Sequence, residues 1–342
     1  IGSGPFKFES YSKGVDVVLS RNPDYFKAGL PYLDGVRLFL ISDRAAQYAA
    51  FRTGQIHMPF AAFDPQILQG RDEQLPKDIP GVQTQILMGG HARILFNNVA
   101  PWSDQRARKA VNLAVNRKDY QDVYQLGKGT PFILLAPPKL GGGKWAFSED
   151  EIAKLSGYRL DKKADDIAEA KRLLQQAGIN VQTLKPVAKV RDIYENVAVP
   201  VVDQLKRSLG LDIAIRIEDG PTTLKTQATG QFELTVDQNS YALDDPSQMF
   251  APFVRTGGPA NYAKWSDTEL DALIDQIELT LDETKRLDLT HRIELKLLDL
   301  SWIVTLGSTV SLIAWSPNMR NFQGGGAQDG PWLRYDDVWL AG

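Results

Sequence analysis

Apolar and polar residues alternate near both ends of the chain, which predicts β-strands there. Residues 6–9, FKFE, alternate aromatic and charged side chains, and residues 15–19, VDVVL, alternate in the same way after a turn at Gly14. The stretch GVRLFLI at 35–41 carries apolar side chains on both faces, which indicates a strand covered on both sides. Two apolar stretches near the C-terminus, WIVTLGSTVSLIAW and LRYDDVWL, predict closing strands.

Helical periodicity characterises the middle of the chain. Ala107, Ala110, Val111 and Ala114 follow the i, i+3, i+4, i+7 spacing of an amphipathic helix, for which Ser103 is the predicted cap. The same reasoning predicts helices over 42–54, 164–179, 192–209 and 283–299, and a short helix from Pro221. Strands are predicted at 92–98, 181–190, 211–217 and 232–238, and Pro- and Gly-rich loops at 59–82 and 127–150.

The segment WSDTELDAL is the strongest local helix signal. Ser266 and Glu269 have the spacing of a capping box, in which each side chain accepts from a free backbone N–H. Leu270, Ile274 and Ile277 continue on one face, so a helix is predicted from this point.

Strand-rich ends flank a mixed α/β middle. We therefore expect an α/β fold in which one lobe is assembled from both ends of the chain and another lobe is inserted between them.

Composition narrows the class of protein. The 342 residues include 39 basic and 42 acidic side chains, a net charge of -3, which argues against a nucleic-acid partner. There is no cysteine, so disulfides and thiolate metal sites are excluded, and no run of 18 apolar residues is present.

Catalytic and cofactor motifs are also lacking. The three histidines form no metal-binding motif, and His291 is expected to be a surface residue of its helix. Neither a Walker loop nor a nucleophile elbow occurs, so no enzyme activity and no cofactor are expected. Carboxylate pairs are too common to be informative, which leaves an extracytoplasmic hydrolase of carbohydrate or ester substrates as the alternative.

The order of motifs resembles the family-five solute-binding proteins of ABC importers, the dipeptide, oligopeptide and nickel-binding type. The resemblance rests on GSGPFKFESY, LSRNPDYF, PYLDGVRLFLI, LFNNVAPWSDQRARKAVNLAVNRKDY, YRLDKKADDIAEAKRLLQQAG and YAKWSDTELDALIDQI, in that order. It implies an α/β, periplasmic binding protein-like (type II) fold, with two lobes built on mixed sheets.

In that family the Gly-Ser-Gly-Pro strand lies well inside the mature protein. The resemblance therefore implies a C-terminal fragment that lacks lobe II and the N-terminal part of lobe I, although a complete, shorter relative is the alternative. Residues 1–88 with 311–342 would form part of lobe I, and 89–310 would form lobe III.

The implied function is capture of a peptide-like or other small organic solute between two hinged lobes, for delivery to membrane permease subunits of an ABC importer. The resemblance implies a monomer in the periplasm, or outside the cell and tethered through an N-terminal signal. An interaction module with a broad apolar patch is a third, weaker reading.

The segment DQNSYALDDP corresponds to the family's solute-contacting segment. Peptide binders of the family carry an aspartate four residues before the proline, where this chain has Ala242, which argues against ordinary peptide binding. Asp244 is a possible substitute or a plain turn residue.

Further contacts are expected beside Asp244. Asn239, Ser240 and Tyr241 are the predicted neighbours in the same segment. His91 and Arg93 lie where the chain enters the inserted lobe, and Arg93 could pair a solute carboxylate or form a structural ion pair. The ring of Trp102 could stack on a solute or anchor its loop.

Overall fold

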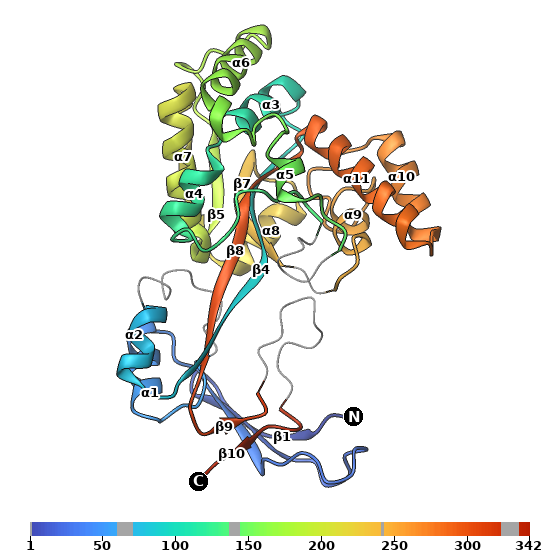
Figure 1. Cartoon of the computed structure of the whole chain (residues 1–342). Coiled ribbons are helices and arrows are strands. Elements are labelled where there is room, and N and C mark those ends of the chain that lie inside the picture. The colour runs from blue at the N-terminus through green and yellow to red at the C-terminus, as the bar shows by residue number, and fades with distance from the viewer. Residues whose placement is uncertain (1, 60–70, 137–143, 241–242, 323–334) are drawn as a thin grey trace. The chain divides into compact units, whose positions relative to one another are not determined.

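The computed structural model describes residues 2–59, 71–136, 144–240, 243–322 and 335–342 (Figure 1). The chain divides into two compact units, Ile1–Leu87 with Ser311–Gly342, and Met88–Val310. The chain passes from one unit to the other inside two long strands, β4 (Gln83–Phe96) and β8 (Ile303–Trp315). That the first unit is part of lobe I and the second unit is lobe III stays a prediction.

The unit formed by both ends of the chain contains a three-stranded antiparallel sheet. Its order is β1-β2-β3, with bounds Phe6–Ser12, Asp16–Arg21 and Gly35–Phe39. Helices α1 (Arg44–Arg52) and α2 (Arg71–Asp78) follow, and β9 (Met319–Arg320) pairs with β10 (Trp339–Leu340). Its small core contains Ile313, Met319, Phe322 and Val338.

The inserted unit is built on a mixed five-stranded sheet of order β6-β5-β7-β4-β8. Strands β5 (Val187–Arg191) and β6 (Ala214–Glu218) are parallel, whereas β7 (Leu234–Ser240) is antiparallel to β4. On β4, the apolar Ala92, Ile94 and Phe96 alternate with the polar His91 and Arg93, which are buried as well, and β7 buries Leu234, Thr235 and Val236 in succession. Both faces of these strands are therefore covered within the unit.

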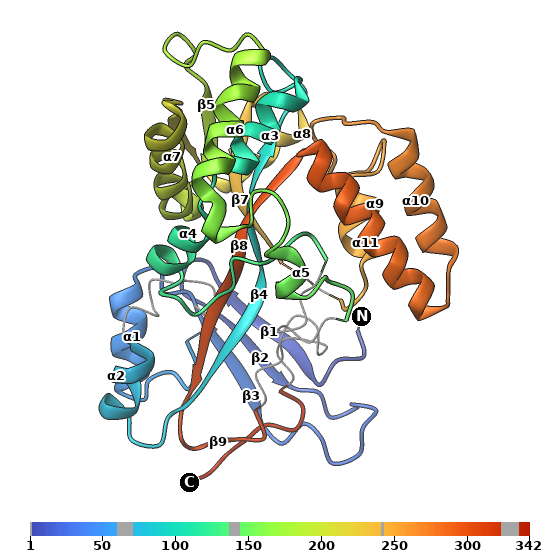
Figure 2. The same cartoon turned by 45° about the horizontal axis from the view of Figure 1, so that its top comes forward.

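Helices lie around this sheet in two groups. The first group is α3 (Gln105–Ala114), α4 (Arg117–Tyr124), α6 (Lys163–Gln176) and α7 (Glu195–Leu209), in which α3 packs against α6. The second group is the hairpin of α10 (Thr268–Leu279) and α11 (Glu283–Leu300), which Figures 1 and 2 show, and the end of α11 contacts α3. The short helices are α5 (Glu149–Ile152), α8 (Gly220–Ala228) and α9 (Ser247–Phe253).

Two predicted helix caps are wrong by one residue. Asp104, not Ser103, caps α3, because its carboxylate accepts from the Arg106 N–H at 2.8 Å. Asp267, not Ser266, caps α10, since its Oδ1 accepts from the Leu270 N–H at 2.9 Å. In both cases a carboxylate makes a stronger, charge-assisted bond to the first turn than a hydroxyl does.

Several predicted loops and strands also differ from the structure. The predicted loop at 59–82 contains α2, and β4 begins at Gln83, well before the predicted strand at 92–98. The stretch WIVTLGSTVSLIAW contains one strand, β8, and of LRYDDVWL only Trp339–Leu340 is a strand among the described residues. Strand β3 is mostly exposed, so the described residues do not cover both of its faces as predicted.

No helix in the described part of the chain is long and apolar enough to cross a bilayer.

Candidate functional site

The end of β7 brings most of the predicted site residues together. In the antiparallel register, Asn239 lies opposite His91, and Ser240 lies opposite Gly90. The backbones approach so closely that a Cβ on Gly90 would lie 1.8 Å from the Asn239 carbonyl oxygen, which explains a glycine at this position.

Arg93 forms a structural ion pair on the same two strands. Its Nε donates to Asp237 Oδ1 at 2.7 Å, and its guanidinium lies 5.0 Å from the ring centre of Phe253. Burial, followed by the charge of Arg93, lowers the pKa of the fully buried His91 imidazole well below its usual value. His91 is therefore neutral, and the charge of Arg93 is compensated within the protein.

The polar side chains at the end of β7 make weaker and fewer contacts within the protein than Arg93 does. The amide of Asn239 accepts from the Ser240 N–H at 3.1 Å and makes a weak contact, 3.7 Å, with the sulfur of Met249. Ser240 is exposed. Tyr241 and Ala242 lie outside the described residues.

The two aspartates after β7 have different surroundings. Both carboxylate oxygens of Asp245 accept from Arg286 at 2.8 Å, and Asp245 Oδ1 also accepts from the Ser247 N–H at 2.8 Å. The Oδ1 atom of Asp244 is buried without a hydrogen-bond partner among the described residues. Burial raises the pKa of the Asp244 carboxyl above its ordinary value, against the smaller lowering effects of Lys144 and Trp145. Asp245 is therefore the turn residue, and Asp244 keeps acceptor capacity.

The loop before α5 holds this segment in place. The indole N–H of Trp145 donates to the Asp244 carbonyl oxygen at 2.9 Å. Trp145 is itself buried, in a small cluster with Ala136 and Ala146 against which Leu287 of α11 packs. The loop and α11 together therefore support the polypeptide that follows β7.

Trp102 does not share this site. Its side chain is 1% exposed and its ring centre lies 4.9 Å from that of Phe96. A ring this deep in the core of its own unit has no free face for a solute, so the structure does not support the predicted stacking role.

Helix α11 contributes residues that the sequence reasoning missed. Arg286 and the buried Glu294 lie on this helix. The residues around them in the sequence do not distinguish them from charged residues that face solvent. His291 is half-buried and stacks on Phe147 with ring centres 3.7 Å apart, so the expectation of a plain surface residue is wrong. The apolar period of α11 is the one sequence signal that pointed to this helix face.

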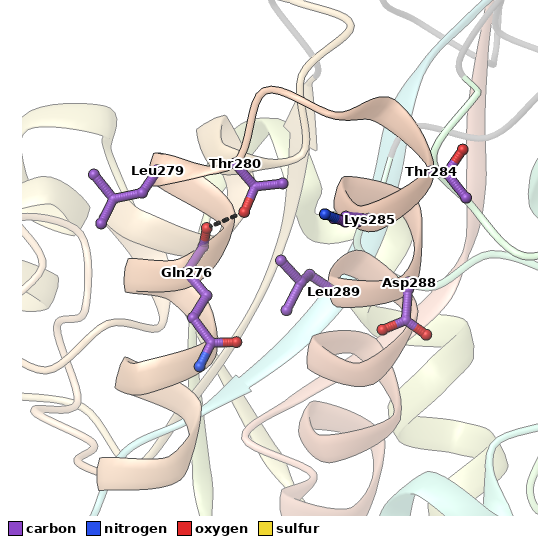
Figure 3. Close-up of a pocket in the computed structure, with 7 residues that line it drawn as sticks. All are labelled: Gln276, Leu279, Thr280, Thr284, Lys285, Asp288 and Leu289. Carbon is purple, nitrogen blue, oxygen red and sulfur yellow. Dashed lines mark hydrogen bonds between the residues drawn. The ribbon is translucent and has the colours of Figure 1, made fainter.

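An open groove of about 530 Å³ lies at the free end of the α10–α11 hairpin (Figure 3). It is lined by Gln276, Leu279, Thr280, Thr284, Lys285, Asp288 and Leu289. Figure 3 shows the Thr280 hydroxyl bonded to the Gln276 carbonyl oxygen, at 2.7 Å, which closes α10. None of the predicted site residues lines this groove.

The matching family model and two curated relatives of this chain are described as solute-binding or peptide-binding proteins. A family model described as bacterial extracellular solute-binding proteins, family 5 Middle, matches residues 1–261. The periplasmic oligopeptide-binding protein OppA of Salmonella typhimurium is 23% identical over 300 residues, which cover 87% of this chain and 53% of the relative. The dipeptide-binding protein DppE of Bacillus subtilis is 24% identical over 303 residues, covering 86% and 52%. The chain thus spans about half the length of these curated relatives.

Solved structures share the fold. OppA of Haemophilus influenzae in complex with RPPGFSPFR superposes with a TM-score of 0.81 at 19% identity, covering 99% of this chain and 64% of that one. DppA of Helicobacter pylori in complex with the peptide STSA gives 0.78 at 22% identity, covering 99% and 63%. These neighbours confirm the predicted α/β, type II periplasmic binding protein-like fold with mixed sheets.

Proposed function

Because the chain belongs to the bacterial extracellular solute-binding proteins of family 5, we propose that it serves as the solute-binding component of an ABC importer. It captures a peptide-like or other small organic solute and presents it to membrane permease subunits. The observation that carries this proposal is the family match across residues 1–261. The relatives' names describe binding proteins, which favours binding over the hydrolase alternative.

The proposal places the protein outside the cytoplasmic membrane, as a monomer. The unit formed by residues 1–87 and 311–342 corresponds to part of lobe I, and residues 88–310 correspond to lobe III. A solute supplies the free energy for lobe closure through contacts that form in the closed state.

Asp244 is the proposed anchor for a solute ammonium group. Its Oδ1 is buried without a partner among the described residues, a condition that a positively charged donor would relieve. Asp245 cannot serve in its place, since Arg286 already occupies both of its carboxylate oxygens. Asp244 would take over the role of the aspartate that this chain lacks at position 242, since its carboxylate lies two residues further along the chain.

Asn239, Ser240 and Tyr241 are the proposed neighbouring contacts. The amide of Asn239 and the exposed hydroxyl of Ser240 can donate to and accept from a peptide backbone. Arg93 and His91 are proposed to act beneath them, where the Arg93–Asp237 pair keeps β4 and β7 in register.

Isothermal titration of the complete protein tests both proposals. We expect a library of short peptides that includes STSA to contain ligands, and we expect N-terminal acetylation of those ligands to weaken binding at least about tenfold. Asp244→Asn should weaken binding of the free-amino peptides by a similar factor and remove the effect of acetylation.

The matched control is Asp288→Asn, because Asp288 is an exposed aspartate that forms a long ion pair, 3.9 Å, with Arg292. This variant should bind like the unchanged protein. If Asp244→Asn binds the free-amino peptides as tightly as the unchanged protein and still discriminates against the acetylated ones, Asp244 does not belong to the site. Peptide hydrolysis without any binding would overturn the proposed function itself.

A further inference from the structure

Arg286 connects three separate segments of the inserted unit. One amino group of its guanidinium, Nη1, donates to the carbonyl oxygens of Ile277 at 2.7 Å and Thr280 at 3.1 Å, at the end of α10. The other, Nη2, donates to both carboxylate oxygens of Asp245 at 2.8 Å and to the Ser247 hydroxyl at 3.3 Å. The side chain is only 12% exposed, so water does not replace these bonds readily.

The third segment is the loop that carries Trp145. The Arg286 guanidinium lies 5.4 Å from the ring centre of Trp145, whose indole N–H holds the carbonyl of Asp244. Leu287, the next residue of α11, packs against the same small cluster. Two neighbouring aspartates are therefore held from one helix, Asp245 directly and Asp244 through Trp145.

An arginine is required by this geometry. One planar guanidinium reaches two backbone carbonyls with one nitrogen and a carboxylate with another, whereas a lysine offers a single nitrogen. Removing the guanidinium also leaves the partly buried carboxylate of Asp245 without its cation.

We propose that Arg286 is a positioning residue for solute binding. It fixes the conformation of residues 243–247 through Asp245 and Trp145, so that Asp244 meets the solute in a preformed geometry. A preformed segment spares the solute the entropic cost of ordering it, which strengthens binding without any contact from Arg286 itself. This inference rests on the proposed function.

The test compares Arg286→Met, Arg286→Lys, Asp245→Asn and the double variant in the complete protein. Amide hydrogen exchange of residues 243–249 reports the order of the segment, and titration with the tetrapeptide STSA reports solute binding. We expect Arg286→Met to speed exchange in this segment at least about tenfold and to weaken STSA binding by a similar factor. Arg286→Lys should restore little of either, and Asp245→Asn should add nothing to Arg286→Met.

Lys296→Met is the matched control on the same helix. Lys296 pairs with Asp267 at 3.2 Å and Glu269 at 2.6 Å, so its loss removes a cation from α11 without touching residues 243–247. It should leave both exchange and affinity unchanged.

Three results would overturn the inference: unchanged exchange in Arg286→Met, faster exchange with unchanged affinity, or an equal effect of Lys296→Met. Failure of the proposed function looks different. The unchanged protein would then bind no peptide, while hydrogen exchange would still decide whether Arg286 orders the segment. If Arg286→Met fails to fold, the same readouts on Arg286→Lys decide the question.

Discussion

Replacing Glu294 by Gln should remove a pH dependence of stability that the folded structure imposes. Glu294 is 2% exposed on α11, and its Oε1 accepts from the Leu135 N–H at 3.0 Å and the Ala136 N–H at 2.8 Å. Its Oε2 is buried without a hydrogen-bond partner among the described residues. Burial raises the pKa of this carboxyl from its ordinary 4.5 to about 7, against the smaller lowering effect of the two N–H donors.

The direction and size of the effect follow from that pKa. The folded state holds the proton up to about pH 7, whereas the unfolded chain releases it near 4.5. The unfolding free energy is therefore greatest below the unfolded pKa and falls as the pH rises through the folded pKa. At about 1.4 kcal/mol for each pKa unit, the total loss across this window is about 3 kcal/mol.

Urea unfolding at about pH 4 and about pH 8 measures this loss. A neutral glutamine keeps a carbonyl oxygen for the two N–H donors and does not titrate, so Glu294→Gln should lose about 3 kcal/mol less than the unchanged protein between those pH values. Glu283→Gln is the control, because that exposed carboxylate on the same helix pairs with Lys144 in solvent. Parallel pH profiles for Glu294→Gln and the unchanged protein would show that Glu294 does not change its protonation on unfolding.

Four further substitutions test the packing and one hydrogen bond. Ile277→Ala, at a fully buried position, should cost about 2–5 kcal/mol in urea unfolding. Leu281→Ala, at a position in the turn after α10 that is 93% exposed, should change stability by less than about 0.5 kcal/mol, and equal costs would contradict the burial of Ile277. Gly307→Ala should lower the melting temperature, because Gly307 has φ +136° and a Cβ there would lie 2.1 Å from Gln121 Nε2; an unchanged melting temperature would show that the strand does not need glycine. Trp145→Phe should cost about 1 kcal/mol through loss of its hydrogen-bond donor, and calorimetry that finds no loss would show that this bond does not stabilise the loop.

The groups at the candidate site were only partly predictable. The sequence identifies Asn239, Ser240 and Asp244 because all three lie in one contiguous segment, DQNSYALDDP, that can be recognised without knowledge of the fold. The partners that give them their properties come from elsewhere: Arg93 and Asp237 are 144 residues apart, and Arg286 and Asp245 are 41 apart. Such pairs leave no local pattern, since any charged residue on an exposed-looking face could have supplied them.

Local patterns in the sequence are enough to predict the periodic elements and their order. The helical period of α3, α6, α10 and α11 and the α/β succession follow from local apolar spacing, because each element must bury one face. The folded chain, in contrast, pairs Arg93 with Asp237, places Trp102 in the core and brings Arg286 to the segment after β7. Burial and charge pairing depend on which distant surfaces meet. They also set the pKa of a group and the hydrogen-bonding atoms that it has left for a solute.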